Sequence, residues 1–388
     1  MRSLLALIIA TGGLHGLAAA MEPVNMESLY GAPKGQAEGL RLMHPDADTL
    51  RAWDQRRFRG QQVPPAPPAK ALPEAVDLLP YFEYVPEEHD QGDCGNCWAW
   101  AATGCIQMRL STQYGVRDRL STQLITSCFL DHFACMGGLD IDGASFYNRT
   151  GYCIPWSNPN AAYAQYDTDY ETMTPATLCE DIGTAPRYLL HNVAPRIVPT
   201  WAMTREEAID TLKYELSQGN ALFFAFYLPE AADGDAFRTY WLEHGEDEYI
   251  DLSAWDGHTW DEDAGGGHAV LCVGYRDNAW LLLNSWGTVE GLRPNGLFAV
   301  GPMDSMDYAA AYVHEEAKSS HALFFWSVLD TSYAGYDGDG DGVSDAVEAE
   351  FGTDPMDRTD APALPLPWPL VGLTLAVAGG AVLVRRRL

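Results

Sequence analysis

The spacing of polar and apolar positions in the middle of the chain predicts two helices. Residues 97–110 place apolar side chains at positions 98, 101, 102, 105, 106 and 108, which is the spacing of one helix face. Further along, Thr204 and Glu207 form a capping box, which predicts a helix that runs to about Ser217 with Gly219 just past its end. The helical periods therefore precede most of the strand-like runs.

Continuous apolar runs later in the chain predict buried strands. They cover residues 221–228, 269–275 and 279–283. Because helices come first and strands later, the pattern favours an α+β unit over a βαβ repeat. A chain of 388 residues exceeds the usual single domain, so we expect one sizeable folded unit at residues 72–330 with appendages on both sides.

The N-terminal end has the pattern of an exported protein. Residues 1–20 carry a basic residue, then an apolar run, and close on the alanines at 18–20, which is the pattern of a cleaved signal peptide. The mature protein is therefore expected outside the cytoplasm, where disulfides persist. Residues 21–71 lack clear periodicity and end in a proline-rich linker, which predicts a pro-segment that is removed near Lys70.

The C-terminal end predicts an anchor. Residues 361–384 are uncharged and are followed by three arginines, so residues 361–388 could span a bilayer and hold the main body outside the cytoplasm. The same arrangement resembles bacterial sorting tails that are clipped and replaced by a surface anchor. Both alternatives place the protein at the cell surface or on a membrane.

The most specific signal is the segment Gln-Gly-Asp-Cys-Gly-Asn-Cys-Trp-Ala at residues 91–99. It places Cys97 in the first turn of a helix, where free backbone N–H groups and the helix dipole favour a thiolate. The segment resembles the active-site segment of papain-like cysteine proteases. The resemblance implies that Cys97 is the nucleophile and that the Gln91 side chain and the Cys97 N–H form the oxyanion hole.

Two later segments extend the resemblance in the order Cys, His, Asn. Gly-Gly-Gly-His-Ala-Val at residues 265–270 matches the family's histidine strand, and Asn-Ser-Trp-Gly at residues 284–287 matches its asparagine motif. His268 would then be the general base and acid, and Asn284 would accept the second imidazole N–H and fix the tautomer. Trp286 would shield that hydrogen bond from water and border the substrate site.

The resemblance also implies a fold and a way to bind substrate. The fold has two lobes, a helical left lobe and an antiparallel β-barrel right lobe, with the active-site cleft between them. Gly137 and Gly138 match the glycine pair that binds an extended peptide, and the backbone of Gly138 would pair with it. No cofactor is expected for catalysis.

The number of cysteines leaves one pairing open. Eight cysteines minus the nucleophile leave seven, which is an odd number. The resemblance implies two disulfides, Cys94 with Cys135 and Cys128 with Cys179. Cys153 could compete for Cys179, and Cys105 and Cys272 lie on apolar faces as expected for buried thiols.

An acidic motif near the C-terminus predicts a structural calcium site within residues 336–360. The spacing of its oxygen ligands, with glycine at the sixth position, is that of a loop wrapped around Ca²⁺. It resembles thrombospondin type 3 and EF-hand-like repeats, and calcium would stiffen a stalk without taking part in hydrolysis. The expected ligands are Asp337, Asp339, Asp341, the Val343 carbonyl, Asp345 and Glu348.

The overall prediction is an exported cysteine endopeptidase that acts on proteins or peptides through a thioester acyl-enzyme. A formal charge of −30 argues against a nucleic-acid partner. Residues 229–263, which are rich in Trp, Asp and Glu, have the character of an insertion before His268. Their acidic side chains suggest substrates with basic side chains. Two alternatives stay open: an acyltransferase of the same fold, and an inactive calcium-dependent surface binding protein.

Overall fold

The computed structural model describes residues 20–30, 41–45, 48–53, 71–164, 174–309, 311–314 and 319–362. Nearly all of the predicted signal peptide, most of the proline-rich linker and almost the whole predicted tail lie outside these ranges. Within the ranges, none of the helices combines the length and the apolar character that crossing a bilayer requires.

The described residues form helices, short 3₁₀ turns and strands. The helices are α2 (Cys97–Tyr114), α3 (Thr122–Cys128), α4 (Asp140–Thr150), α5 (Arg205–Ser217), α6 (Ala231–Glu243) and α7 (Asp345–Phe351). The 3₁₀ turns are η1 (Met26–Leu29), η2 (Leu79–Tyr81), η3 (Pro86–Glu88), η4 (Ala134–Met136), η5 (Cys179–Asp181), η6 (Thr200–Ala202) and η7 (Leu252–Trp255). The strands are β1 (Glu22–Pro23), β2 (Val76–Asp77), β3 (Tyr152–Cys153), β4 (Arg187–Val198), β5 (Leu222–Leu228), β6 (Glu248–Ile250), β7 (Gly266–Arg276), β8 (Ala279–Leu283), β9 (Leu297–Val300), β10 (Ala311–His314), β11 (Ser319–Ala322) and β12 (Phe324–Asp337).

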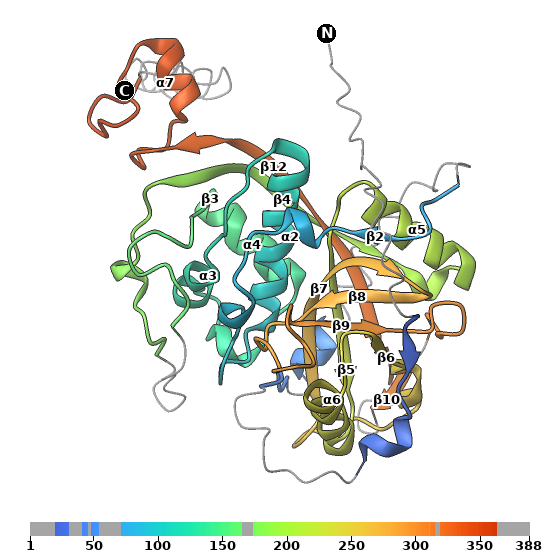
Figure 1. Cartoon of the computed structure of the whole chain (residues 1–388). Helices are drawn as coiled ribbons and strands as arrows, with labels where there is room; N and C mark the ends of the chain where they lie inside the picture. The colour runs from blue at the N-terminus through green and yellow to red at the C-terminus, as the bar shows by residue number, and fades with distance from the viewer. Residues whose placement is uncertain are drawn as a thin grey trace, which may run out of the picture.

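Helices and sheet occupy different sides of the molecule. Helices α2, α3 and α4 gather on one side, and strands β5, β7, β8 and β9 form the other (Figure 1). The main sheet has the order β1-β6-β9-β8-β7-β5-β12-β4-β3. Its neighbours are antiparallel except for the parallel pairs β1 with β6 and β6 with β9. This α+β arrangement is the fold class that the sequence predicted.

Helix α2 packs directly on the sheet. A Cβ atom at Gly104 would lie 2.9 Å from Cδ2 of Leu271 on β7, so a larger residue there would force the leucine side chain to shift. The periodicity predicted one apolar face, but nearly every residue from Cys97 to Ser111 is buried. The reason is that α4 and the sheet cover the helix from different sides. The start of α2 is therefore fixed against β7.

Local signals in the sequence predicted the ends of α5, and they placed β7 to within a few residues. The Thr204 hydroxyl accepts from the Glu207 N–H (3.2 Å), and the Glu207 carboxylate accepts from the Thr204 N–H (2.8 Å), which is the predicted capping box. Helix α5 ends at Ser217, and Gly219 follows with a φ of 81°. Strand β7 begins at Gly266, earlier than the predicted start at residue 269, so His268 lies within a strand.

Two pairings join parts of the chain that are far apart in sequence. Strand β12 pairs first with β5 and then with β4, and it runs on to Asp337, through the expected domain boundary at residue 330. Residues 229–263 fold into α6, β6 and η7, and β6 pairs with β1 from the predicted pro-segment. The upstream residues 20–30 are therefore part of the folded unit.

Candidate active site

Cys97 is the first residue of α2 and is fully buried. The backbone N–H of Ala269, the residue after His268, donates to the Cys97 sulfur at 3.4 Å. This contact holds the thiol against β7. The Trp98 indole N–H donates to the Ala134 carbonyl (3.0 Å) and secures the first turn of the helix.

His268 lies on β7 with its imidazole held on one side only. Nε2 of His268 lies 2.7 Å from Oδ1 of Asn284, and since an amide oxygen only accepts, Nε2 carries the proton. Asn284 is itself oriented, because its Oδ1 also accepts from the Ser285 N–H at 2.9 Å. Nδ1 of His268 is buried and has no hydrogen-bond partner among the described residues. It is therefore the nitrogen free to exchange a proton.

Aromatic rings enclose this imidazole. The Trp286 ring lies 4.6 Å from the His268 ring, centre to centre, at 31°. Phe226 and Phe237 approach the same imidazole at 5.7 Å and 5.9 Å. Trp286 is thus in ring contact with His268, and its role as a shield of the His268–Asn284 hydrogen bond stays a prediction.

Gln91 is held in place by several hydrogen bonds. Its Oε1 accepts from the Ser285 hydroxyl (2.6 Å), and its Nε2 donates to the Cys94 carbonyl (2.7 Å). The same Nε2 also donates to the carbonyl oxygen of Arg41 at 3.0 Å. The predicted oxyanion-hole donor is therefore already bound to a carbonyl oxygen from the predicted pro-segment.

Residues 41–45 run across the site. Met43 and Gly267 exchange two backbone hydrogen bonds of 2.9 and 2.8 Å, as in an added strand. Nδ1 of His44 lies 3.1 Å from the Gly265 carbonyl oxygen. The Met43 side chain lies against Gly137, where an added Cβ would come within 3.2 Å of it. The upstream chain thus covers both the histidine strand and the glycine pair.

Burial shifts the pKa values of Cys97 and His268. Burial raises the pKa of the Cys97 thiol to about 12, against the lowering effect of the N–H groups of Ala269 and Trp98. Burial likewise lowers the pKa of His268 to about 4, although the hydrogen bond to Asn284 acts to raise it. Both groups are therefore neutral near pH 7 in the covered state, in contrast to the thiolate that the sequence predicted.

The glycine pair and the disulfides support the same region. A Cβ at Gly138 would lie 2.6 Å from the Trp98 ring, so glycine is required there. The structure joins Cys94 to Cys135, which ties the nucleophile loop to the glycine pair, and Cys128 to Cys179. The remaining cysteines, Cys105, Cys153 and Cys272, are free buried thiols like Cys97.

A cavity of about 480 Å³ lies beside Gly137. His44, Pro45 and Trp53 line it from the upstream segment, and His132 and Met136 line it from the helical side. The upstream segment therefore forms one wall of the space next to the predicted substrate-binding glycines.

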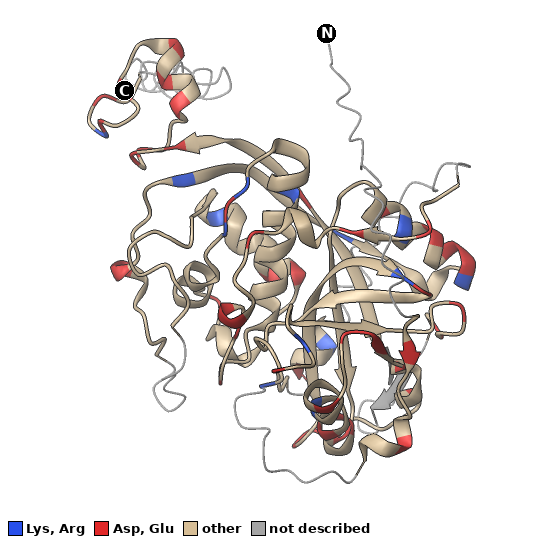
Figure 2. Cartoon of the chain, viewed as in Figure 1, with Lys and Arg blue, Asp and Glu red and all other residues tan. Residues whose placement is uncertain are grey.

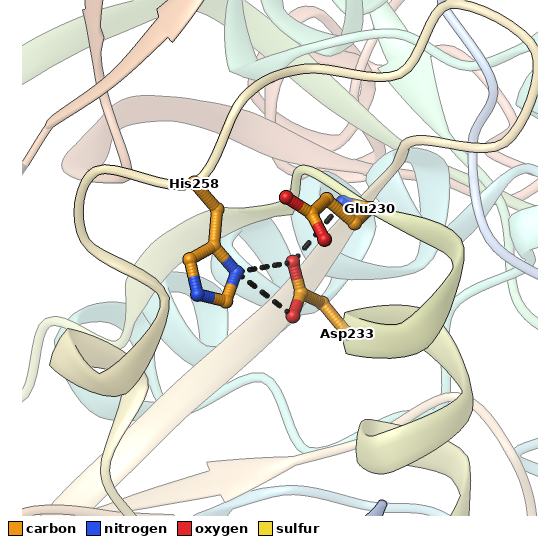
Figure 3. A group of neighbouring side chains, drawn as sticks. All are labelled: Glu230, Asp233 and His258. Carbon is orange, nitrogen blue, oxygen red and sulfur yellow. Dashed lines mark hydrogen bonds and ion pairs between the residues drawn. The ribbon is translucent and has the colours of Figure 1, made fainter.

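The upstream chain is anchored on the acidic insertion. The Tyr30 hydroxyl donates to Oδ1 of Asp233 (3.0 Å) and accepts from the Trp255 indole N–H (2.9 Å). Figure 3 shows His258 directed at the Asp233 carboxylate, with Nδ1 at 3.0 Å from both oxygens, and Glu230 beside them. Both Asp233 oxygens accept hydrogen bonds, Oδ1 from the Tyr30 hydroxyl and Oδ2 from the Glu230 N–H. The cluster therefore anchors Tyr30.

The predicted calcium ligands lie apart from the catalytic pair, at the end of β12. Carboxylate oxygens of Asp337, Asp339 and Asp341 lie within 4.8 Å of one another, and α7 brings Glu348 to the same loop. These residues make no contribution to the arrangement around Cys97.

Sequence reasoning missed several contributors to the site. Ala269 and Ser285 flank recognised motif residues, yet their contacts depend on how β7 and the following loop fold. The Tyr163 hydroxyl donates to the Gln91 carbonyl (3.0 Å) from 72 residues away. In the upstream segment, the apolar pair Leu42 and Met43 was the signal that could have indicated a buried stretch.

Comparisons with known proteins find similarity to cysteine proteases. Residues 72–184 match the family described as papain family cysteine protease. The chain is 28% identical over 214 residues to Pro-cathepsin H of Medicago truncatula, covering 52% of this chain and 50% of that protein. It is 35% identical over 230 residues to the probable cysteine protease RDL3 of Arabidopsis thaliana, covering 57% and 51%.

The comparison with solved structures also finds cysteine proteases. Xylellain, a cysteine protease from Xylella fastidiosa, aligns with a TM-score of 0.43 and 20% identity over 75% of this chain and 96% of its own. The chain spans about half the length of the curated relatives named above. The family model covers the segment with Gln91, Cys97 and the glycine pair, and it ends before His268 and Asn284.

Proposed function

We propose that the chain is a cysteine endopeptidase with Cys97 as nucleophile and His268 as general base and acid. The observation that carries the proposal is the state of His268. Its Nε2–H is bound to Asn284, its Nδ1 is free, and the next residue along β7 contacts the Cys97 sulfur. In this tautomer Nδ1 is the nitrogen that would take the proton of the nearby thiol.

The reaction follows from these positions. His268 Nδ1 takes the thiol proton, and the Cys97 sulfur attacks the carbonyl carbon of a peptide bond. The Gln91 Nε2–H and the Cys97 N–H donate to the oxygen that becomes negative. His268 then protonates the departing amine, which leaves a thioester. Water gives a proton to His268 and attacks the thioester carbon, which releases the acid and restores the thiol.

The covered state is proposed to be latent. The Arg41 carbonyl uses the Gln91 Nε2–H, and Met43 occupies the backbone edge at Gly267. A substrate would need the same hydrogen-bonding groups, so the upstream segment has to leave before catalysis begins. Burial by this segment also keeps the pair neutral, and its removal is expected to restore the thiolate.

The proposed substrates are extended polypeptides, with a preference for basic side chains. Figure 2 shows acidic residues along α6 and around the C-terminal loop, while Lys and Arg are scattered. The proposed setting is outside the cytoplasm, and two disulfides in the folded unit support an oxidising compartment. Attachment to a membrane or surface through residues 361–388 remains part of the proposal.

The test compares a chain that begins at Leu72 with one that begins at Met21. An epoxide or iodoacetamide-type probe is added near neutral pH, and peptide hydrolysis is followed in parallel. We expect fast labelling confined to Cys97 in the shorter chain, lost in Cys97→Ala and strongly slowed in His268→Ala. His191→Ala is the matched control, because His191 is exposed and lies on β4, away from the site.

Two outcomes would redirect the proposal. Labelling that is slow in the shorter chain, or indifferent to His268→Ala, would overturn the peptidase and favour an inactive binding protein. Products that carry an added amine acceptor, formed in preference to the free acid, would show an acyltransferase of the same fold.

A further inference from the structure

The loop at residues 337–348 gathers carboxylates, and several of their oxygens have no hydrogen-bond partner among the described residues. Glu348 is fully buried, and neither of its side-chain oxygens has a hydrogen-bond partner among the described residues. Oδ2 of Asp339 and Oδ2 of Asp341 are also buried atoms without a hydrogen-bond partner among the described residues. Buried carboxylate oxygens without partners are costly, so they point to a positively charged ligand.

The backbone of the loop is shaped around the same point. N–H groups of Gly340 and Gly342 donate to the two oxygens of Asp337 at 2.7 and 2.9 Å. The Val343 N–H donates to Oδ1 of Asp341 at 2.7 Å. Gly342 has a φ of 104°, a conformation that favours glycine at the sharp turn of the loop. Both oxygens of Asp337 accept from this backbone, whereas only one oxygen of Asp341 is bonded, and its Oδ2 has no partner among the described residues.

The charge of the loop supports the same conclusion. The described cation that pairs with the loop is Arg187, whose Nε lies 2.8 Å from Oδ2 of Asp337. Because this guanidinium bonds one oxygen of Asp337 alone, the other carboxylates of the loop have no paired cation among the described residues.

The loop is also attached to the main body. Asp337 is both the first loop ligand and the last residue of β12, where it pairs in register with Arg187 at the start of β4. The Arg187 guanidinium lies over the Tyr152 ring, 4.8 Å from its centre. Close to this point, a Cβ at Gly340 would lie 2.9 Å from the Ala185 side chain. Order in the loop is therefore coupled to the β4–β12 pair.

We propose that residues 337–348 bind one calcium ion, which fastens α7 and the chain beyond it to the end of the β4–β12 pair. The oxygen-only ligand set suits a hard cation, and a twelve-residue loop that closes on a glutamate suits Ca²⁺ better than Mg²⁺. The ion clamps the C-terminal segment and takes no part in hydrolysis. Arg187 acts as a positioning residue for Asp337.

The test uses the full chain with Cys97→Ser, so that self-digestion cannot interfere. Calcium binding is measured by titration calorimetry, and the thermal midpoint is compared in Ca²⁺, in Mg²⁺ and in a chelator. At calcium 100-fold above Kd, we expect the midpoint to rise by roughly 5 °C. Protease cleavage within residues 338–351 should slow at least about tenfold, because ligand binding lowers the population of the open loop.

A matched pair of variants on α7 separates metal binding from ordinary stabilisation. Glu348→Gln should abolish the response to calcium without lowering the midpoint in chelator, since it removes an uncompensated charge. Glu350→Gln changes an exposed carboxylate on the same helix and should keep the full response. An unchanged midpoint and no heat of binding in the parent chain, or a full calcium response in Glu348→Gln, would overturn the proposal.

Discussion

At the residue scale, Gln91 has two roles that can be separated. It braces the loop through Ser285 and Cys94, and its Nε2 donates to the Arg41 carbonyl. In the proposed active form, that donor would instead stabilise the oxyanion of the substrate. The ground state needs the donor less than the transition state does, so its removal should lower the rate more than the binding of substrate.

We therefore expect Gln91→Ala to lower kcat by about 10²- to 10³-fold in the chain that begins at Leu72, with a small change in KM. Cys97 should still react with a thiol probe, because the thiol and His268 are untouched. Peptide hydrolysis and probe labelling measured side by side check this, with thermal unfolding as the control for folding. An unchanged kcat would remove Gln91 from the oxyanion hole.

The covered thiol gives a prediction on pH. A thiol is protonated below its pKa, so a pKa of about 12 leaves very little thiolate at pH 7 in the chain that begins at Met21. Labelling of Cys97 should be at least about 10²-fold slower in that chain than in the shorter one, and it should rise steadily toward pH 10. The pH profile of labelling checks this. A plateau between pH 6 and 8 in the longer chain would contradict it.

At the element scale, the short-range features of the site were predictable and the long-range pairings were not. The start of α2, the strands around His268 and Asn284, and the capping box at Thr204 are encoded within a few residues. The pairing of β1 with β6 joins segments more than two hundred residues apart, and no local pattern contains that information. The same holds for the contact of Met43 with Gly267.

The sequence pattern did not show how far β12 extends, for a related reason. Its early residues are apolar and pair with β5, but its later residues are mixed in character and pair with β4 alone. Periodicity detects a face that is buried, so it detects poorly a strand whose outer part is half exposed. The neutral state of the covered thiol was not predictable for the same reason, because helix position alone contains no information on what covers the thiol.

The anchor of the upstream segment yields a prediction at this scale. Tyr30→Phe removes the hydroxyl that bonds Asp233 and Trp255, so the segment should leave the site more often. We expect labelling of Cys97 in the chain that begins at Met21 to rise about threefold to tenfold, as for the loss of one or two hydrogen bonds. Tyr114→Phe is the matched control, since its ring is exposed and lies away from the segment. Equal labelling in both variants would exclude this anchor.

At the scale of the whole molecule, the net charge of −30 makes the surroundings of the site attractive to cations. We expect kcat/KM for peptides rich in Lys and Arg to fall about tenfold between low salt and 0.5 M salt, as screening shortens the range of the field. Neutral peptides of the same length are the control and should change little. A salt dependence shared by both peptides would remove electrostatic attraction as the cause.

The long antiparallel contact of β12 with β4 also has a mechanical consequence. Asp337, the last residue of β12, pairs with the first residue of β4, so the chain leaves the folded unit along the axis of the strand. Tension applied to the C-terminal end would therefore act on the β4–β12 hydrogen bonds in shear, and they would have to break together instead of one after another. A protein pulled by its C-terminal end would resist extension at the β4–β12 pairing.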